Sequence, residues 1–284
     1  MKRKLLFFLF TVIWSIPILS QDAVASKEDI EKFLKTKTYV VLDNNIFGSY
    51  NKAIKQAIED YWTITPFEFI DATKYNQMKG SYRNSFIIRT KVNFEKDKSK
   101  ANYTFVSVLL GSNKASAMEN MPDLCSFPLS YYNVDYDKYH YKLGAIIKFM
   151  QNHIILTRDH PELDAKNILK YYNNNTHELT GKTLYVIQDE LDKDVNSLEK
   201  IKKYYNGKVV ITTSEEIQKV IHSKDPDAVF LHKVGPSEDD EKARIYKLIL
   251  GASDGKLYYF DYHKYKQGKT EDAFLATDFQ NLSK

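Results

Sequence analysis

The chain has 284 residues, of which 43% are apolar and 27% are charged, and this balance is typical of a folded globular protein rather than a disordered one. Its formal charge is only +4 and no block of Lys or Arg follows the N-terminus, which argues against nucleic acid or an anionic membrane surface as the partner. The single cysteine, Cys125, excludes an intramolecular disulfide, and we expect it to be a buried apolar residue.

The first 25 residues have the pattern of a secretory signal. A basic start, MKRK, precedes an apolar run of 15 residues, LLFFLFTVIWSIPIL, and Ala23-Val24-Ala25 then offers a cleavage site. The run is short for a bilayer span, so we interpret it as cleaved, with an uncleaved anchor as the alternative. The sequence therefore predicts an exported bacterial protein, periplasmic or secreted, with no membrane span after cleavage.

Short matches recur in the same order in the two halves of the chain, and their spacing shrinks toward the C-terminus. The matches are KTYVVLD at 37 with KTLYVIQD at 182, FIIRTKV ending at 92 with VFLHKV ending at 234, Leu-Gly at 110–111 and at 250–251, and DYDKY at 135 with DYHKY at 261. Matches that keep their order indicate a tandem duplication.

In the first half, apolar runs predict strands over 39–42, 66–70, 86–92 and 103–110, and a fifth, Tyr-rich strand within SYYNVDYDKYHY at 130–141. A helix between the first two strands has the apolar stripe Ile54, Ala57, Ile58 and Tyr61. A short helix after the second strand begins at Asp71, a good N-cap. Gly111 closes the fourth strand, where we expect a glycine with positive φ.

The second half predicts the same order of elements. Strands are expected over 184–187, 208–212, 228–234 and 245–250, with a Tyr-rich fifth strand in KLYYFDYHKY at 256–265. The first helix carries Val195, Leu198, Ile201 and Tyr205 as its stripe, and the second opens on a capping box from Thr213 to Glu216. Asp254-Gly255 predicts a tight turn before the last strand.

These elements predict an α/β (α+β) protein of two tandem βαβαβββ modules, each a mixed sheet with helices mainly on one face. We expect a signal peptide over 1–25, a first module over 26–158, a connecting helix and linker over 159–180, and a second module over 181–284. The order of elements resembles the small α/β modules of envelope proteins, such as the N-terminal domain of TolB. The resemblance is one of topology and carries no functional residue across.

No strong catalytic motif is present. The chain lacks a phosphate-binding glycine loop, a G-x-S-x-G elbow and the H-E-x-x-H spacing of a helical zinc site. We therefore expect no cofactor, no metal and no catalytic residue. A hydrolase with a non-local triad is the remaining enzymatic alternative, since residues distant in sequence can meet in space.

The strongest candidate binding residues lie in the two Tyr-rich segments. Side chains two apart on a strand share a face, and aromatic and carboxylate groups together could bind a sugar, a peptide edge or a divalent ion. The alternative is an amphipathic strand whose rings pack against the core. The predicted ligand-binding residues are Tyr132, Asp135, Asp137, Tyr139, Tyr259, Asp261, His263 and Tyr265.

The sequence as a whole favours a non-catalytic exported protein that binds or scaffolds through a sheet face, a sheet edge or the cleft between its modules. Its expected partner is another envelope protein, or a glycan or peptide. The alternative is a glycan, peptide or small-molecule binder with a site between the repeats, lined by Tyr132, Asp135, Tyr259 and Asp261. The sequence does not predict an oligomeric state.

Overall fold

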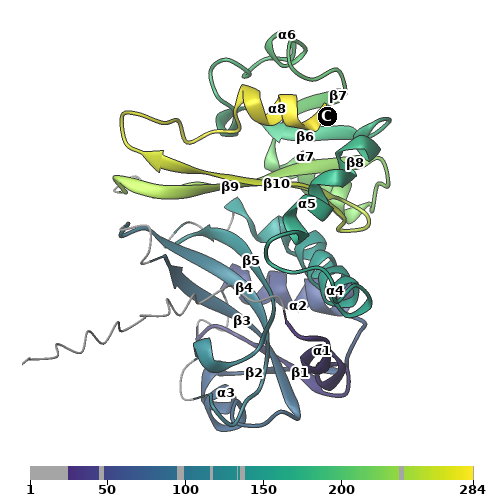
Figure 1. Ribbon diagram of the computed structural model, residues 1–284, viewed down its shortest axis with the longest axis vertical. Coiled ribbons are helices and arrows are strands. Elements are labelled where there is room, and N and C mark those ends of the chain that lie inside the picture. The colour runs from purple at the N-terminus through teal and green to yellow at the C-terminus, as the bar shows by residue number, and fades with distance from the viewer. Residues whose placement is uncertain are drawn as a thin grey trace, which may run out of the picture.

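The computed structural model describes residues 25–44, 48–94, 99–115, 118–132, 134, 138–236 and 240–283. Within them the strands form two five-stranded mixed sheets, one above the other in Figure 1. The predicted signal peptide lies, except for Ala25, outside the described residues. None of the helices in these ranges is both long enough and apolar enough to cross a membrane.

The first sheet has the strand order β2-β1-β3-β4-β5. Strand β1 pairs in parallel with both β2 and β3, and the β3–β4 and β4–β5 pairs are antiparallel. The bounds are Lys37–Val41 for β1, Phe67–Ile70 for β2, Asn84–Asn93 for β3, Asn102–Leu110 for β4 and Asp123–Tyr131 for β5.

The second sheet repeats this order as β7-β6-β8-β9-β10, with the same parallel and antiparallel pairs. The bounds are Thr183–Ile187 for β6, Lys208–Thr212 for β7, Ala228–Val234 for β8, Lys242–Gly251 for β9 and Leu257–Lys266 for β10. The predicted α/β fold class of two similar modules is therefore confirmed. The predicted boundaries near 158 and 181 stay predictions, and the strands of the two sheets lie on either side of them.

Helices cover both sheets in the same way. In module one, helices α1, α2 and α4 pack on one face of the sheet and α3 on the other. In module two, α6 and α8 pack on one face and α7 on the other. The bounds are Lys27–Phe33 for α1, Ser49–Tyr61 for α2, Ala72–Met78 for α3, Leu143–Asp159 for α4, Leu198–Ile201 for α6, Ser214–His222 for α7 and Ala276–Leu282 for α8.

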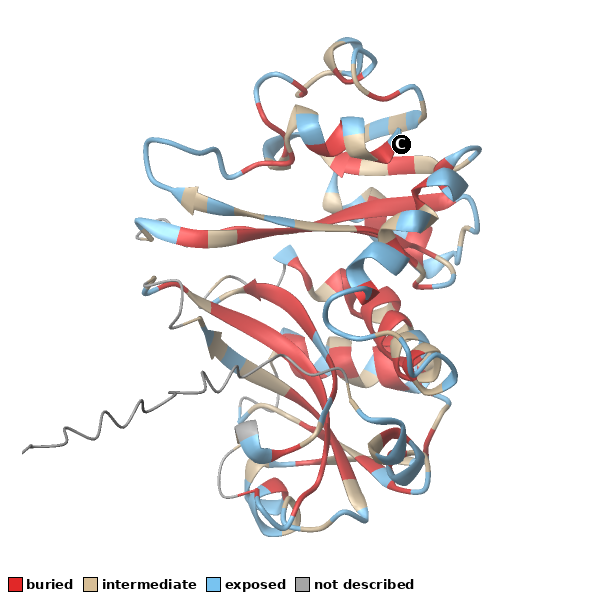
Figure 2. Ribbon diagram, in the orientation of Figure 1, coloured by how far each residue is buried: buried red, intermediate tan, exposed pale blue. Residues whose placement is uncertain are grey.

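The two modules share one hydrophobic core. Phe127 and Phe149 of module one belong to the same buried cluster as Phe230 and Leu248 of module two, and Figure 2 shows buried residues in the strands of both sheets and along α4. The buried His232 Nε2 lies 2.8 Å from the Pro128 carbonyl oxygen across the junction. Apolar side chains of both modules are therefore buried together at the junction.

The modules stack through non-equivalent faces of their sheets. The side of module one that carries α2 and α4 packs against the side of module two that carries α7. Helix α5 (Ile168–Asn173) and the 3₁₀ helix η5 (Asn174–Leu179) link the modules. Asn173 in this link bonds the backbone of Phe260 in both directions, at 2.9 and 2.7 Å.

The predicted fifth strand of module one was placed too late in the chain. Strand β5 covers Asp123–Tyr131, whereas Tyr139 lies next to the 3₁₀ helix η4, His140–Lys142. Residues 135–137 lie outside the described residues. The real strand contains Pro128, which argues against a central strand but is tolerated at the edge of a sheet, where β5 lies.

The two Leu-Gly pairs both end a fourth strand, but their glycines do not have positive φ. They are required by close contact instead. A Cβ at Gly111 would overlap the Ser81 carbonyl oxygen, and one at Gly251 would overlap the Asp254 carboxylate. Side chains alternate along a strand, so Leu110 faces α2 and α4, whereas Leu250 faces α7. The α7 face of module two corresponds to the α3 face of module one, so the two Leu-Gly pairs are out of register by one residue.

Two predicted helix starts had different outcomes. Asp71 caps α3, with its carboxylate accepting from Lys74 N at 2.7 Å. The Thr213 side chain forms no capping bond to α7. The apolar stripe predicted over 195–205 forms only the four-residue helix α6, while Val195 and Tyr205 are buried in the turns around it.

Candidate functional site

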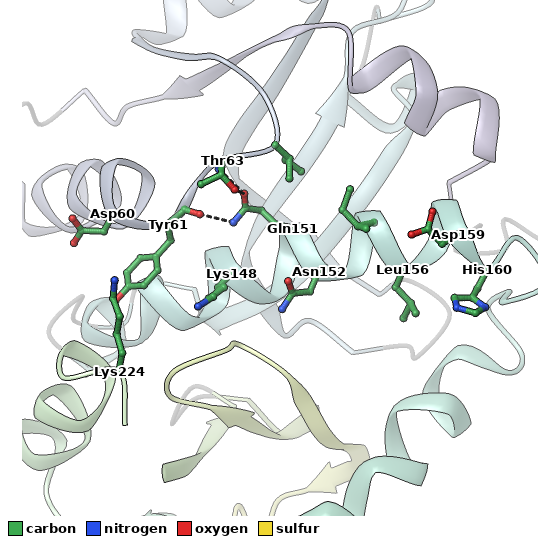
Figure 3. Close-up of a pocket in the computed structure, with 12 residues that line it drawn as sticks. Asp60, Tyr61, Thr63, Lys148, Gln151, Asn152, Leu156, Asp159, His160 and Lys224 are labelled. Carbon is green, nitrogen blue, oxygen red and sulfur yellow. Dashed lines mark hydrogen bonds between the residues drawn. The ribbon is translucent and has the colours of Figure 1, made fainter. Parts of the chain in front are cut away.

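A groove of about 550 Å³ runs along helix α4, where the two modules meet (Figure 3). Its floor is a stripe of α4 with helical spacing, its wall is formed by residues at the end of α2, and Lys224 after α7 closes one end. It is open to solvent rather than enclosed. The lining is Asp60, Tyr61, Thr63, Ile64, Lys148, Gln151, Asn152, Ile155, Leu156, Asp159, His160 and Lys224.

The wall from module one is fixed by the end of α2. Trp62 is buried just after the helix and its Nε1 donates to Thr65 Oγ1 at 2.9 Å. Gly144 leaves room for the Tyr61 ring, because a Cβ there would lie 2.6 Å from Tyr61 Cε2. The ring therefore lies directly against α4.

Gln151 joins this wall to the floor. Its Oε1 accepts from Thr63 N at 2.7 Å, and its Nε2 donates to the Tyr61 carbonyl oxygen at 2.6 Å. The side chain is buried and both ends of its amide are satisfied. The groove is therefore preformed at this point.

The turn between β9 and β10 lies against the other side of α4. Lys148 Nζ donates to the Ser253 carbonyl oxygen at 2.6 Å, and Asn152 Nδ2 donates to that of Asp254 at 2.8 Å. Gly255 has φ +63°, and a Cβ there would lie 2.7 Å from the Ala145 carbonyl oxygen. The tight turn predicted at Asp254-Gly255 therefore holds module two against α4.

One end of the groove carries two ammonium groups around one aromatic ring. Lys148 Nζ lies 6.0 Å and Lys224 Nζ 5.0 Å from the Tyr61 ring centroid. Burial, with a smaller contribution from Asp60, raises the pKa of Tyr61, so its phenol stays protonated at neutral pH. The Asp60 carboxylate accepts a hydrogen bond from Gln56 Nε2 at 2.9 Å.

The opposite end of the groove is less cationic. The Asp159 carboxylate accepts two hydrogen bonds from Arg158, at 2.7 and 3.0 Å, and these bonds lower the pKa of Asp159. His160 Nδ1 lies 3.0 Å from Glu162 Oε1. Between the two ends, Ile64, Ile155 and Leu156 supply an aliphatic stretch.

A second polar cluster lies beneath α8 in module two. The buried Lys247 on β9 places its Nζ 2.5 Å from Asp278 Oδ1 and 3.5 Å from Asp261 Oδ2. Tyr259 donates its hydroxyl hydrogen to Asp278 Oδ1 at 2.8 Å, and burial raises the pKa of Tyr259. The other Asp278 oxygen accepts from Leu275 N at 2.7 Å, at the start of α8.

The structure brings together three of the residues predicted in module two. Tyr259, Asp261 and His263 alternate along β10 on the face beneath α8. His263 Nε2 lies 3.0 Å from the Glu271 carbonyl oxygen, and burial lowers the pKa of His263. Tyr265, the fourth, is half-buried at the other end of this strand.

The residues predicted in module one do not gather with them. Tyr132 is exposed just past the end of β5, with Lys91 Nζ 4.2 Å from its ring centroid. Tyr139 is buried in the shared core. Asp135 and Asp137 lie outside the described residues. The described lining of the groove includes none of the eight predicted residues, and Lys247 and Asp278 were not predicted.

No group of three or more His, Cys, Asp or Glu suited to hold a metal ion is found in the described part of the chain. Cys125 is a buried free thiol, as expected, and burial raises its pKa well above the ordinary value. The hydrolase alternative stays a prediction.

Comparison with known proteins gives no identification: no family model, no curated protein and no solved structure matches the chain. The resemblance in topology to envelope-protein modules therefore stays an analogy.

Proposed function

We propose that this protein is a non-catalytic, exported binding protein, and that the groove along α4 holds an extended segment of a partner protein. The observation that carries the proposal is the groove of about 550 Å³ along α4, lined by residues of module one, by His160 after α4 and by Lys224 of module two. Clefts between structural units are common binding sites. The secretory signal predicted from the sequence supports an exported location.

The shape of the groove favours a short extended peptide. Lining residues 148 to 159 cover 11 steps of α4, or about 17 Å at 1.5 Å per residue. An extended chain rises about 3.3 Å per residue, so five or six residues would span the floor.

The chemistry of the groove favours a peptide over a glycan. Sugars stack on open aromatic faces, but Tyr61, the one Phe, Tyr or Trp in the described lining, already has two ammonium groups near its ring. The middle of the groove is aliphatic, with Ile64, Ile155 and Leu156. Such a surface suits the aliphatic side chains of a peptide.

The test is an array of six-residue peptides, acetylated and amidated at their ends, probed with the purified protein. We expect a subset of peptides to bind, and Ile155→Glu to abolish their binding because it puts a charge on the aliphatic floor. The matched control is Val210→Glu, which adds the same charge on strand β7 at a side chain that is 37% exposed.

Each other outcome counts against the proposal. Peptide binding that survives Ile155→Glu would place the site elsewhere on the molecule. An array on which no peptide binds the wild-type protein would remove the peptide proposal.

A further inference from the structure

We propose that the partner segment is acidic, and that a carboxylate of an Asp or Glu side chain is bound between Lys148 and Lys224 at the Tyr61 end of the groove. This inference rests on the proposed function of the groove and adds the chemical class of its ligand. It comes from the arrangement of the two ammonium groups and from the backbone of Lys224.

Lys224 has the one left-handed backbone conformation among the non-glycine residues that the structure describes, with φ 54°. It follows the C-terminus of α7, where Asp225 N donates to the Val220 carbonyl oxygen at 3.1 Å and Lys224 N to that of Ile221 at 3.1 Å. This is the Schellman arrangement, in which glycine is the usual residue at the left-handed position. A lysine there is strained, and strain that persists is a reason to look for function.

The Lys224 side chain offers a functional reason for the strained residue, because its ammonium group is available to a ligand. Lys224 is exposed, and within the described residues its ammonium group forms no hydrogen bond or ion pair, only the contact with the Tyr61 ring. Lys148 uses one of its three N–H groups on the Ser253 carbonyl oxygen, which leaves two. Both ammonium groups are thus available to an incoming anion.

The neighbouring groups favour an anion at the same place. The Tyr61 phenol, kept protonated, is a further hydrogen-bond donor. Asn152, on the next turn of α4 after Lys148, is exposed beside it. The Asp60 carboxylate, which accepts from Gln56 Nε2, keeps its negative charge and opposes an anion, so the two ammonium groups have to outweigh it. A carboxylate here would be attracted by two cations at once and could accept a charge-assisted hydrogen bond from each.

The experiment uses capped six-residue Ala-Leu peptides with one Asp at each of the six positions in turn, and an Asn counterpart of each. Fluorescence polarisation measures their affinity for the full chain. We expect the best Asp peptide to bind about tenfold more tightly than its Asn counterpart, as for loss of a hydrogen bond to a charged group. Added salt should narrow the difference.

The decisive variant is Lys224→Gly. It removes the ammonium group and relieves the backbone, so we expect the preference for Asp to vanish while the midpoint of thermal unfolding rises. A purely structural lysine would not separate the two readouts in this way. Lys224→Arg should keep the preference, and Lys203→Asn, an exposed lysine beside α6, should change neither readout.

The failures are distinguishable. Equal binding of Asp and Asn peptides, or an Asp preference that survives Lys224→Gly, would overturn the acidic ligand. If binding still depends on Ile155, the groove would remain the peptide site. Absence of binding by every peptide of the set and of the array would overturn both proposals.

Discussion

The two modules have the same strand order, but the side chains beneath α4 in module one are apolar and those beneath α8 in module two are charged. In module one, α4 covers the cross-strand pair Val106 and Phe127, both fully buried. In module two, α8 covers the cross-strand pair Lys247 and Asp261, joined by Asp278 from the helix itself. The fold therefore does not require charge at this place, since module one forms it with apolar side chains.

The difference follows from the length of each helix and from how much apolar surface it buries. Helix α4 has 17 residues and is packed by both modules, so it buries a long apolar surface. Helix α8 has seven residues and buries Phe279 and Leu282. A seven-residue helix is marginal by itself, and the Lys247–Asp278 pair and the bond to Leu275 N hold it at a defined position.

The largest effect is expected from breaking the charged pair. Lys247→Met should lower the free energy of unfolding by about 3–5 kcal/mol, because it leaves the buried Asp278 without its cation. Urea denaturation measures the change.

The double variant Lys247→Met with Asp278→Asn should recover most of the loss, because no unpaired charge stays buried, the amide oxygen can accept from Leu275 N, and the amide NH2 can donate to the Tyr259 hydroxyl oxygen. Equal losses in the single and double variants would mean that the ion pair is not what holds α8.

The next largest effect is expected at the contact between the β9–β10 turn of module two and helix α4. Gly255→Ala should destabilise by about 3 kcal/mol, because an alanine there combines a strained φ with overlap of the α4 backbone. Gly268 is the matched control. It has φ +71° with nothing within 4 Å of the added Cβ, so Gly268→Ala should lose only about 1–2 kcal/mol.

A third prediction concerns the loss of folding stability at low pH, which should come from two buried histidines of the shared core. Burial lowers the pKa of His153 to about 4 and that of His232 to about 3. In the unfolded chain both titrate near 6.5, so between the folded and unfolded values the unfolded state binds more protons.

Stability is therefore complete above about pH 6.5 and falls as pH drops, by up to about 1.4 kcal/mol per pH unit for each histidine. His232→Gln should reduce the slope measured by urea denaturation between pH 4 and 6. An unchanged slope would show that His232 is not held neutral at the junction.

The smallest effect separates stability from function. Lys224→Gly should raise the free energy of unfolding by about 1 kcal/mol, because glycine adopts the left-handed conformation without strain. Differential scanning calorimetry of the variant beside Lys203→Asn measures it. A lower free energy of unfolding would mean that Lys224 stabilises the C-terminal end of α7.

The sequence predicted the fold where local patterns decide structure. The stripe of Ile54, Ala57 and Ile58 became the buried face of α2, and the runs over 208–212 and 228–234 match β7 and β8. Strand β5 was missed because Pro128 interrupts its pattern. DYDKY and DYHKY look alike, but Tyr139 at the end of the first lies next to η4, whereas Tyr265 at the end of the second lies on β10, since a short motif does not fix its own structure.

The groove could not be predicted from the sequence, because its residues come from distant segments. Tyr61, Lys148 and Lys224 meet only once α4 packs between the modules. One local signal was present: the helix pattern of α7 ends at Ser223 and Lys224 without a glycine. The ion pair of Lys247 with Asp278 was also hidden, since a lysine within an apolar strand gives no indication of its partner.

The most direct test of the account is chemical-shift mapping by NMR of the isotope-labelled protein with the tightest peptide of the array. The account predicts that the largest amide shifts gather at 60–64, 148–160 and 223–225, and that Ile155→Glu removes them. Shifts that gather instead along β7, or around Tyr259 and Asp278 beneath α8, would contradict the groove as the binding site.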